Sequence, residues 1–116
     1  MASERRIEKL NIFFKDELSK ILDRDVEFSP GTLATITRVR TSSDAHYATV
    51  YVSILGADPR NALEILKKNV YALQQALNRK VNMRPVPRIR FAVDEEEERR
   101  ESVEKSISDL KRKGEL

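Results

Sequence analysis

Apolar residues at steps of three and four predict an α-helix near the start of the chain. The periodic positions are Ile7, Leu10, Phe14, Leu18 and Ile21. In a helix over residues 4–22 this spacing gathers them on one stripe, which faces a core. Ser3 stands just before the stripe and is predicted to cap the helix, because its hydroxyl can accept a free amide proton of the first turn.

A two-residue period then predicts a β-hairpin. Residues 33–41 are rich in β-branched side chains, which favour strands. In residues 46–54 apolar and polar residues alternate, so this strand has two unlike faces. One predicted face carries Ala48, Val50, Val52 and Ile54, and the other carries Tyr47, Thr49, Tyr51 and Ser53. The short polar stretch 42–45 joins the two strands, which are therefore expected to pair antiparallel.

Helical spacing returns in the middle of the chain and continues to about residue 81. Asp58 is predicted to cap this segment, with Pro59 at its first helical position. The apolar register shifts near Lys67, Lys68 and Asn69, which indicates two helices with a kink at Asn69. Asparagine is among the few residues besides glycine that accept a left-handed backbone. The alternative is one continuous helix with Asn69 on its surface.

A third strand and a charged last helix complete the predicted order. Pro85 and Pro87 favour an extended backbone, and apolar residues then alternate with Arg88 and Arg90 as far as residue 93. Residues 94–113 are highly charged and carry only a narrow apolar stripe, which is typical of an exposed helix.

The predicted order is helix, strand, strand, helix, helix, strand, helix. An α+β fold, with helices on one face of a three-stranded sheet, buries these apolar stripes most economically. We divide the chain into a domain of residues 1–94 and a charged helical extension of residues 95–116.

The charge of the chain is unevenly distributed. The net charge of the 116 residues is only +3, but residues 60–90 hold eight basic side chains and one acidic side chain, a net charge of +7. The segments before and after them carry net charges of −1 and −3. A basic central block indicates a polyanionic partner, and nucleic acid is the leading candidate. The alternative is that each basic side chain merely keeps an exposed surface solvated.

The sequence contains few of the residues that catalysis or cofactor binding requires. The chain has no cysteine and one histidine, His46, so no ligand set for a metal is predicted. Its three glycines are scattered and cannot form a phosphate-binding loop. The acidic run 94–98 is explained by the positive end of a helix dipole. We therefore expect no enzyme activity and no cofactor. No apolar run approaches the ~20 residues of a membrane span, and a cytoplasmic protein is expected.

Arginine and lysine side chains are the candidate binding residues, because they contact phosphate oxygens. Two-residue alternation puts Arg88 and Arg90 on one face of the third strand and Arg38 and Arg40 on one face of the first. We expect the cations of residues 60–90 to gather on a single contiguous surface. The candidate RNA-binding residues are Arg84, Arg88, Arg90, Arg79, Lys80, Lys67, Lys68, Arg38 and Arg40.

Several short motifs, in this order and spacing, resemble ribosome-binding factor A. In the hairpin they are Ile-Thr-Arg-Val at residues 36–39, Ser43-Asp44, Ala-Thr-Val-Tyr-Val-Ser at residues 48–53, and Gly56. In the third strand the motif is Val-Pro-Arg-Ile-Arg-Phe at residues 86–91, followed by Asp94. The first helix, with Arg5, Arg6 and Ile7, also fits. The resemblance covers residues 3–98, and no single motif carries it alone.

The resemblance implies a KH-like fold of the second type. It also implies a non-catalytic assembly factor that binds the free small (30S) ribosomal subunit near its decoding-region neck. Such a factor promotes late maturation and 5′-end processing of 16S ribosomal RNA, matters most in the cold, and acts alongside assembly GTPases. We expect it to be a monomer. Like the family, the chain lacks the Gly-x-x-Gly loop of ordinary KH domains, so RNA shape and phosphates are its expected targets.

The chain departs from the family pattern at the kink. Lys67, Lys68 and Asn69 stand where the family usually has Ala-x-Gly, and Ala72 stands where an arginine often follows. Lysine in place of a small residue is expected to affect how the two helices pack. A second hypothesis is a protein-interaction module that uses the sheet edge and the acidic C-terminal helix.

Overall fold

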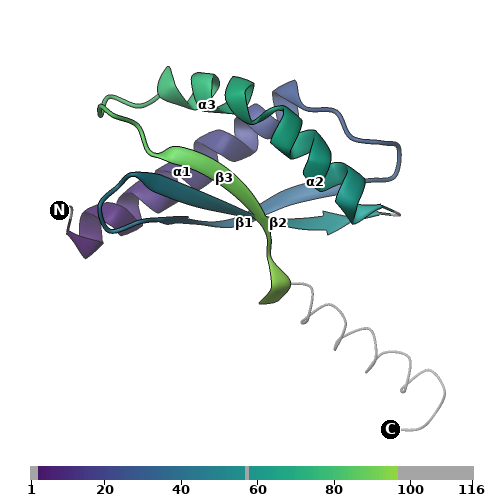
Figure 1. Ribbon diagram of the computed structural model, residues 1–116, viewed down its shortest axis with the longest axis horizontal. Helices are drawn as coiled ribbons and strands as arrows, with labels where there is room; N and C mark the ends of the chain where they lie inside the picture. Colours follow the sequence, from purple (N-terminus) through teal and green to yellow (C-terminus); the bar gives the residue numbers. More distant parts are fainter. Residues whose placement is uncertain (1–2, 57, 97–116) are drawn as a thin grey trace, which may run out of the picture.

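The computed structural model describes residues 3–56 and 58–96, and it has three helices on one face of a three-stranded sheet (Figure 1). The elements are α1 (Glu4–Asp25), β1 (Leu33–Thr41), β2 (Tyr47–Leu55), α2 (Pro59–Lys68), α3 (Val70–Asn78) and β3 (Arg88–Val93). The predicted order and the α+β class are confirmed over this range. The predicted last helix lies almost entirely outside the described residues.

The sheet is mixed, with β2 in the centre. β1 pairs antiparallel with β2, and β3 pairs parallel with β2 on its other side. A parallel neighbour needs a long crossover connection, and α2 and α3 provide it across the same face that α1 covers (Figure 1). This is the KH-like arrangement of the second type.

The core lies between β2 and the helices. Ala48, Val50 and Val52 are fully buried on the inward face of β2, and they belong to one cluster with Phe14 of α1 and Leu66 of α2. The predicted inward set of this strand is therefore confirmed. The residues that alternate with it point away from the helices, toward the open face of the sheet.

A β-bulge at Thr37 divides β1 into two parts. The pairing register with β2 shifts between Ile36 and Arg38, so Thr37 is an extra residue without its own partner. Ile36 is buried, as is Val39 three residues later. Simple alternation would have put Arg38 on the same face as Ile36, and the bulge turns Arg38 outward instead.

The helix boundaries follow from local capping. The hydroxyl of Ser3 accepts the amide proton of Arg6 at 3.3 Å, and Asp58 accepts that of Asn61 at 3.1 Å, as the sequence predicts. The helix does break at Asn69 into α2 and α3, so the continuous helix is ruled out.

The left-handed backbone expected at Asn69 is wrong, because its φ is −95° and its ψ is 1°. The last turn of α2 closes normally there: the backbone amide of Asn69 donates to the Ile65 carbonyl at 3.1 Å, and its side-chain amide donates to the same oxygen at 2.7 Å. One residue in a non-helical conformation suffices to change the direction of the chain.

Gly56 ends β2 in a conformation that requires glycine. Its φ is +142°, and a Cβ atom there would lie 2.9 Å from Oγ1 and 3.0 Å from Cα of Thr32. We expect Gly56→Ala to lower the free energy of unfolding by about 2–4 kcal/mol, from backbone strain and crowding together.

Gly31 is the matched control for this substitution. Its φ is +80°, but nothing lies within 4 Å of a Cβ atom built on it. Gly31→Ala should cost only about 1 kcal/mol. Urea denaturation followed by circular dichroism measures both variants, and equal losses would contradict the role given to Thr32.

Candidate nucleic-acid interface

The outward face of the sheet carries a row of arginines. Cross-strand pairing aligns Arg40 of β1, Thr49 of β2 and Arg90 of β3 in one row. The flanking rows pair Tyr47 with Arg88, and Arg38 with Tyr51. We call this surface the basic sheet face and define it by Arg38, Arg40, Tyr47, Thr49, Tyr51, Arg88 and Arg90. A basic stripe therefore crosses the sheet on the side away from the helices.

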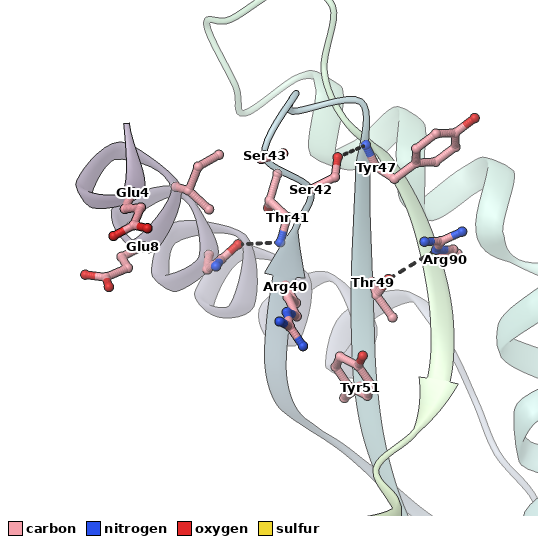
Figure 2. Close-up of a pocket in the computed structure, with 12 residues that line it drawn as sticks. Glu4, Glu8, Arg40, Thr41, Ser42, Ser43, Tyr47, Thr49, Tyr51 and Arg90 are labelled. Atoms are coloured by element: carbon pink, nitrogen blue, oxygen red, sulfur yellow. Dashed lines mark hydrogen bonds between the residues drawn. The ribbon is translucent and has the colours of Figure 1, made fainter. Parts of the chain in front are cut away.

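Arg90 is oriented by two neighbours on β2. Its Nε donates a hydrogen bond to the hydroxyl of Thr49 at 3.1 Å, and its guanidinium carbon lies 5.2 Å from the centre of the Tyr47 ring (Figure 2). Its terminal nitrogens bond to none of the described residues. Arg90 is exposed, so these nitrogens remain available to an anionic ligand.

Arg38 is more strongly engaged within the protein. Its guanidinium carbon lies 4.2 Å from the centre of the Tyr51 ring, and its Nε is 3.7 Å from Oδ2 of Asp94. The Asp94 side chain is only 7% exposed, and the same oxygen accepts a hydrogen bond from the Thr37 hydroxyl at 2.5 Å. Arg38 thus neutralises a buried carboxylate and packs against the Tyr51 ring, so its guanidinium is held in place by the protein itself.

A groove of about 640 Å³ runs from α1 over the hairpin onto the basic sheet face (Figure 2). Its far wall is the N-terminal part of α1, with Glu4 and Glu8, and its floor includes Arg40, Tyr51 and Arg90. The side-chain oxygen of Asn11 accepts the backbone amide proton of Thr41 at 2.9 Å, which ties α1 to the free edge of β1. This bond fixes the two walls relative to each other.

The hairpin turn at one end of the groove is held by Asp44. Its carboxylate accepts hydrogen bonds from the Ser42 hydroxyl at 2.6 Å and the His46 amide at 3.1 Å, and it lies 3.0 Å from Nδ1 of His46. The Ser42 bond is the largest of the effects that lower the pKa of Asp44 from 3.8 to about 2. The turn that carries Tyr47 is therefore ordered by a side-chain network.

The other candidate cations lie in the helix layer. Lys67 and Lys68 are exposed at the end of α2, beside the kink, and Arg79 and Lys80 are exposed just after α3. Arg88 and Arg90 lie on the opposite side of the sheet, so the expectation of one contiguous basic surface is wrong. The physical reason is that β3 buries its apolar residues under the helices and must turn its arginines the other way.

Arg84 hydrogen-bonds to the backbone of the loop before β3. Its Nη1 donates to the carbonyl oxygens of Val81 at 2.8 Å and Met83 at 2.7 Å. A guanidinium bound to its own backbone in this way has fewer free donors for phosphate. Its charge alone did not reveal this role.

The sequence reasoning missed the aromatic and hydroxyl members of the basic sheet face. Alternation along the strand predicts that Tyr47, Thr49 and Tyr51 share one face, but the candidates predicted from the sequence are all charged residues. The signal was available: an aromatic residue that alternates into the same face as arginines is a candidate for nucleic-acid contact.

The described residues show neither a metal-binding cluster nor a membrane-spanning helix. Across residues 3–56 and 58–96, no three or more His, Asp and Glu side chains come close enough together to hold a metal ion. Among the same residues no helix is both long and apolar enough to cross a bilayer.

Comparison with known proteins gives the family. The family model of ribosome-binding factor A matches residues 6–107. The chain belongs to the ribosome-binding factor A family. The ribosome-binding factor A of Acetivibrio thermocellus is 33% identical over 107 residues, which cover 90% of this chain and 87% of that protein.

Solved structures of the family agree with this fold. The crystal structure of ribosome-binding factor A from Thermus thermophilus has a TM-score of 0.66 and 30% identity, and the match covers 75% of this chain and 93% of that one. A homology model of the Thermus protein, fitted into the cryo-EM map of a 30S complex, has a TM-score of 0.61 and 30% identity. That match covers 71% of this chain and 88% of the fitted chain.

The lysine at the kink does not enter the core. Lys67 is exposed, whereas Leu66 beside it is fully buried. The lysine side chain therefore stays out of the packed core of the helix layer.

Removal of the Asp94 carboxylate is expected to destabilise the sheet. Asp94→Ala leaves the Arg38 guanidinium without its charge partner and removes the nearer of the two acceptors of the Thr37 hydroxyl. Because the Arg38 side chain is 43% exposed and partly solvated, we expect a loss of about 1–3 kcal/mol in unfolding free energy. Urea denaturation provides the measurement. Lys20→Ala, which breaks the exposed pair with Glu17, is the control and should change stability by less than about 0.5 kcal/mol.

The Asp44 network gives a pH-dependent prediction. A carboxyl pKa that is lower in the folded state stabilises the fold above the unfolded pKa, and this contribution is lost as the pH falls from about 4 toward 2. We expect the Asp44 carboxyl, observed by NMR titration, to have a midpoint near pH 2. Ser42→Ala should raise this midpoint toward 3.8, because the largest stabilising bond is removed. An unchanged midpoint would show that the Ser42 hydroxyl does not bind the carboxylate in solution.

Proposed function

We propose that this chain binds the free small ribosomal subunit and supports late maturation of that subunit, including 5′-end processing of 16S ribosomal RNA. Family membership supports the ribosomal role, and a related protein has been fitted into a 30S complex. The observation that carries the proposal is the row of Arg40, Thr49 and Arg90 on an open sheet face.

Phosphate contact is the chemistry that this face offers. Arg40, Arg88 and Arg90 are exposed, and none of them is in an ion pair with a described residue. Arginines presented on a rigid strand lose little conformational freedom when they bind, and their planar groups match phosphate geometry. The basic sheet face is thus the primary RNA contact of the proposal.

The remaining candidate cations take secondary roles. Lys67 and Lys68 at the kink, with Arg79 and Lys80 after α3, form a further contact on the helix layer. Arg38 and Arg84 act as positioning residues, because each is bound to groups of the protein itself. RNA that touches both layers must wrap around the end of the domain, which favours recognition of a folded RNA by its shape.

The proposed role is that of a non-catalytic binding factor in the cytoplasm. Residues 1–94 would form the RNA-binding domain and residues 95–116 an extension, and assembly GTPases are candidate partners on the subunit. Binding can promote maturation without catalysis, because a factor that binds one conformation of the RNA better than another shifts the population toward it.

A sheet-edge interaction module is less well supported. The free edge of β1 is occupied at Thr41 by Asn11, and the free edge of β3 is occupied by Gln74. The Gln74 side chain accepts from the Ile89 amide at 2.8 Å and donates to the Pro87 carbonyl at 3.1 Å. Edge groups that are already bonded do not template a further strand.

Charge reversal tests the proposed surface. We expect Arg88→Glu combined with Arg90→Glu to weaken cosedimentation with purified free small subunits by at least about tenfold. The log–log salt slope of binding should fall by about 0.7–0.9 for each phosphate contact that is lost.

The control is Lys9→Glu combined with Lys15→Glu on α1. It changes the net charge equally at exposed positions that do not line the groove. Equal losses in both double variants would mean that only net charge matters. Binding that survives high salt and RNase treatment would favour a protein partner instead.

A further inference from the structure

We propose that the basic sheet face binds an unpaired RNA strand and stacks its bases on two tyrosine–arginine pairs, Tyr47 with Arg90 and Tyr51 with Arg38. The proposal rests on the proposed function and deepens it, because it names the form of RNA that this surface takes. Phosphate contacts alone would accept a duplex as readily as a single strand.

Both tyrosines are presented by the same strand on the same face. Tyr47 and Tyr51 are four residues apart on β2, with Thr49 between them in the central row. Each ring has an arginine beside it, with guanidinium carbons at 5.2 Å and 4.2 Å from the ring centres. Aromatic rings and guanidinium planes are the surfaces on which proteins stack unpaired bases.

The distance between the Tyr47 and Tyr51 rings suits a short segment of single-stranded RNA. Four residues of β-strand span roughly 13 Å. At about 3.4 Å per stacked nucleotide this distance corresponds to no more than about four nucleotides, and to fewer when the strand is extended. Arg40 and Arg90 flank Thr49 between the rings, where they can contact the connecting phosphates.

The walls of the groove restrict where the RNA strand can lie. Glu4 and Glu8 line the side formed by α1, and neither is in an ion pair with a described residue. Their negative charge repels phosphates from that wall. The sugar–phosphate backbone is therefore directed over the arginines of β1 and β3 rather than toward α1.

Tyr47 and Tyr71 are both exposed, but only Tyr47 lines the groove. Tyr47 is 44% exposed, although its pairing partner Arg88 and the stacked Arg90 lie close to it. Tyr71 on α3 is 74% exposed, does not line the groove and lies in the helix layer. Tyr71 is thus a matched control for Tyr47.

Intrinsic fluorescence provides a direct test. The chain has three tyrosines and no tryptophan, so a Tyr71→Phe variant emits only from Tyr47 and Tyr51. We expect its emission to be quenched when an unstructured hexanucleotide RNA is added, because stacked bases quench the rings. A hexamer of abasic nucleotides keeps the phosphates and should not quench. Quenching by both, or by neither, would overturn the proposal.

Affinity measurements locate the stacking positions. In fluorescence anisotropy with the same labelled hexamer, Tyr47→Ala should weaken binding about 5- to 150-fold, the range expected for one stacked base. Tyr47→Phe and Tyr71→Ala should bind like the unaltered chain. A blunt-ended RNA duplex, which has no unpaired bases, should bind more weakly than the hexamer and should respond little to Tyr47→Ala.

Further outcomes separate this inference from the proposed function. Urea midpoints verify that each variant is folded. Tyr51→Leu removes the second ring and should also weaken binding of the hexamer, whereas Tyr51→Phe keeps the ring and should not. If Tyr47→Ala reduced binding of the duplex and of the hexamer equally, or reduced neither, the assignment of the stacking site would be wrong. Cosedimentation of the unaltered chain with small subunits would then still stand. If the unaltered chain failed to cosediment, the proposed function itself would fail, whatever the hexamer result.

Discussion

Thr37 and Asp94 together decide which side chains of β1 face the helices. Thr37 is the extra residue of the bulge, and its hydroxyl donates to the carboxylate of Asp94 and to the carbonyl oxygen of Tyr51. The backbone amide of Asp94 in turn donates to the Val52 carbonyl oxygen at 2.8 Å. Asp94 at the end of β3 therefore bonds to β1 through its carboxylate and to β2 through its backbone amide, at the level where β1 changes register. Arg38 supplies the opposite charge that makes its burial tolerable.

The two faces of the sheet differ because of this bulge. Beyond it, Val39 joins the core, while Arg40 enters the row with Thr49 and Arg90. An uninterrupted β1 would bury arginine or expose Ile36, and either choice would cost several kcal/mol. The helices can cover one face completely, and the other remains a flat surface of arginine, threonine and tyrosine. A platform of this kind is suited to an extended polyanion.

Similar arginines have different roles in this domain. Arg38 and Arg84 are bound to a carboxylate and to backbone carbonyls, whereas Arg40, Arg88 and Arg90 keep donors toward solvent. The free arginines lie on β1 and β3, whose backbones are fixed by the sheet, so little order has to be imposed when RNA binds. The hydrogen bond between Asn11 of α1 and Thr41 of β1 likewise holds the wall of the groove in place before RNA binds. The bound arginines shape the surface, and the free ones give it affinity.

Local patterns in the sequence are enough to predict the elements, their order and the α+β class. These follow from local periods and caps, such as Ser3, Asp58 and the alternation along β2, which act between residues close in the chain. The tertiary structure decided the bulge at Thr37, the parallel pairing of β3 with β2, and the separation of Lys67 and Lys68 from the basic sheet face. Each of these depends on which face of the sheet the helices cover. That choice is set by burial of apolar residues distant in sequence, which no local pattern of charge contains.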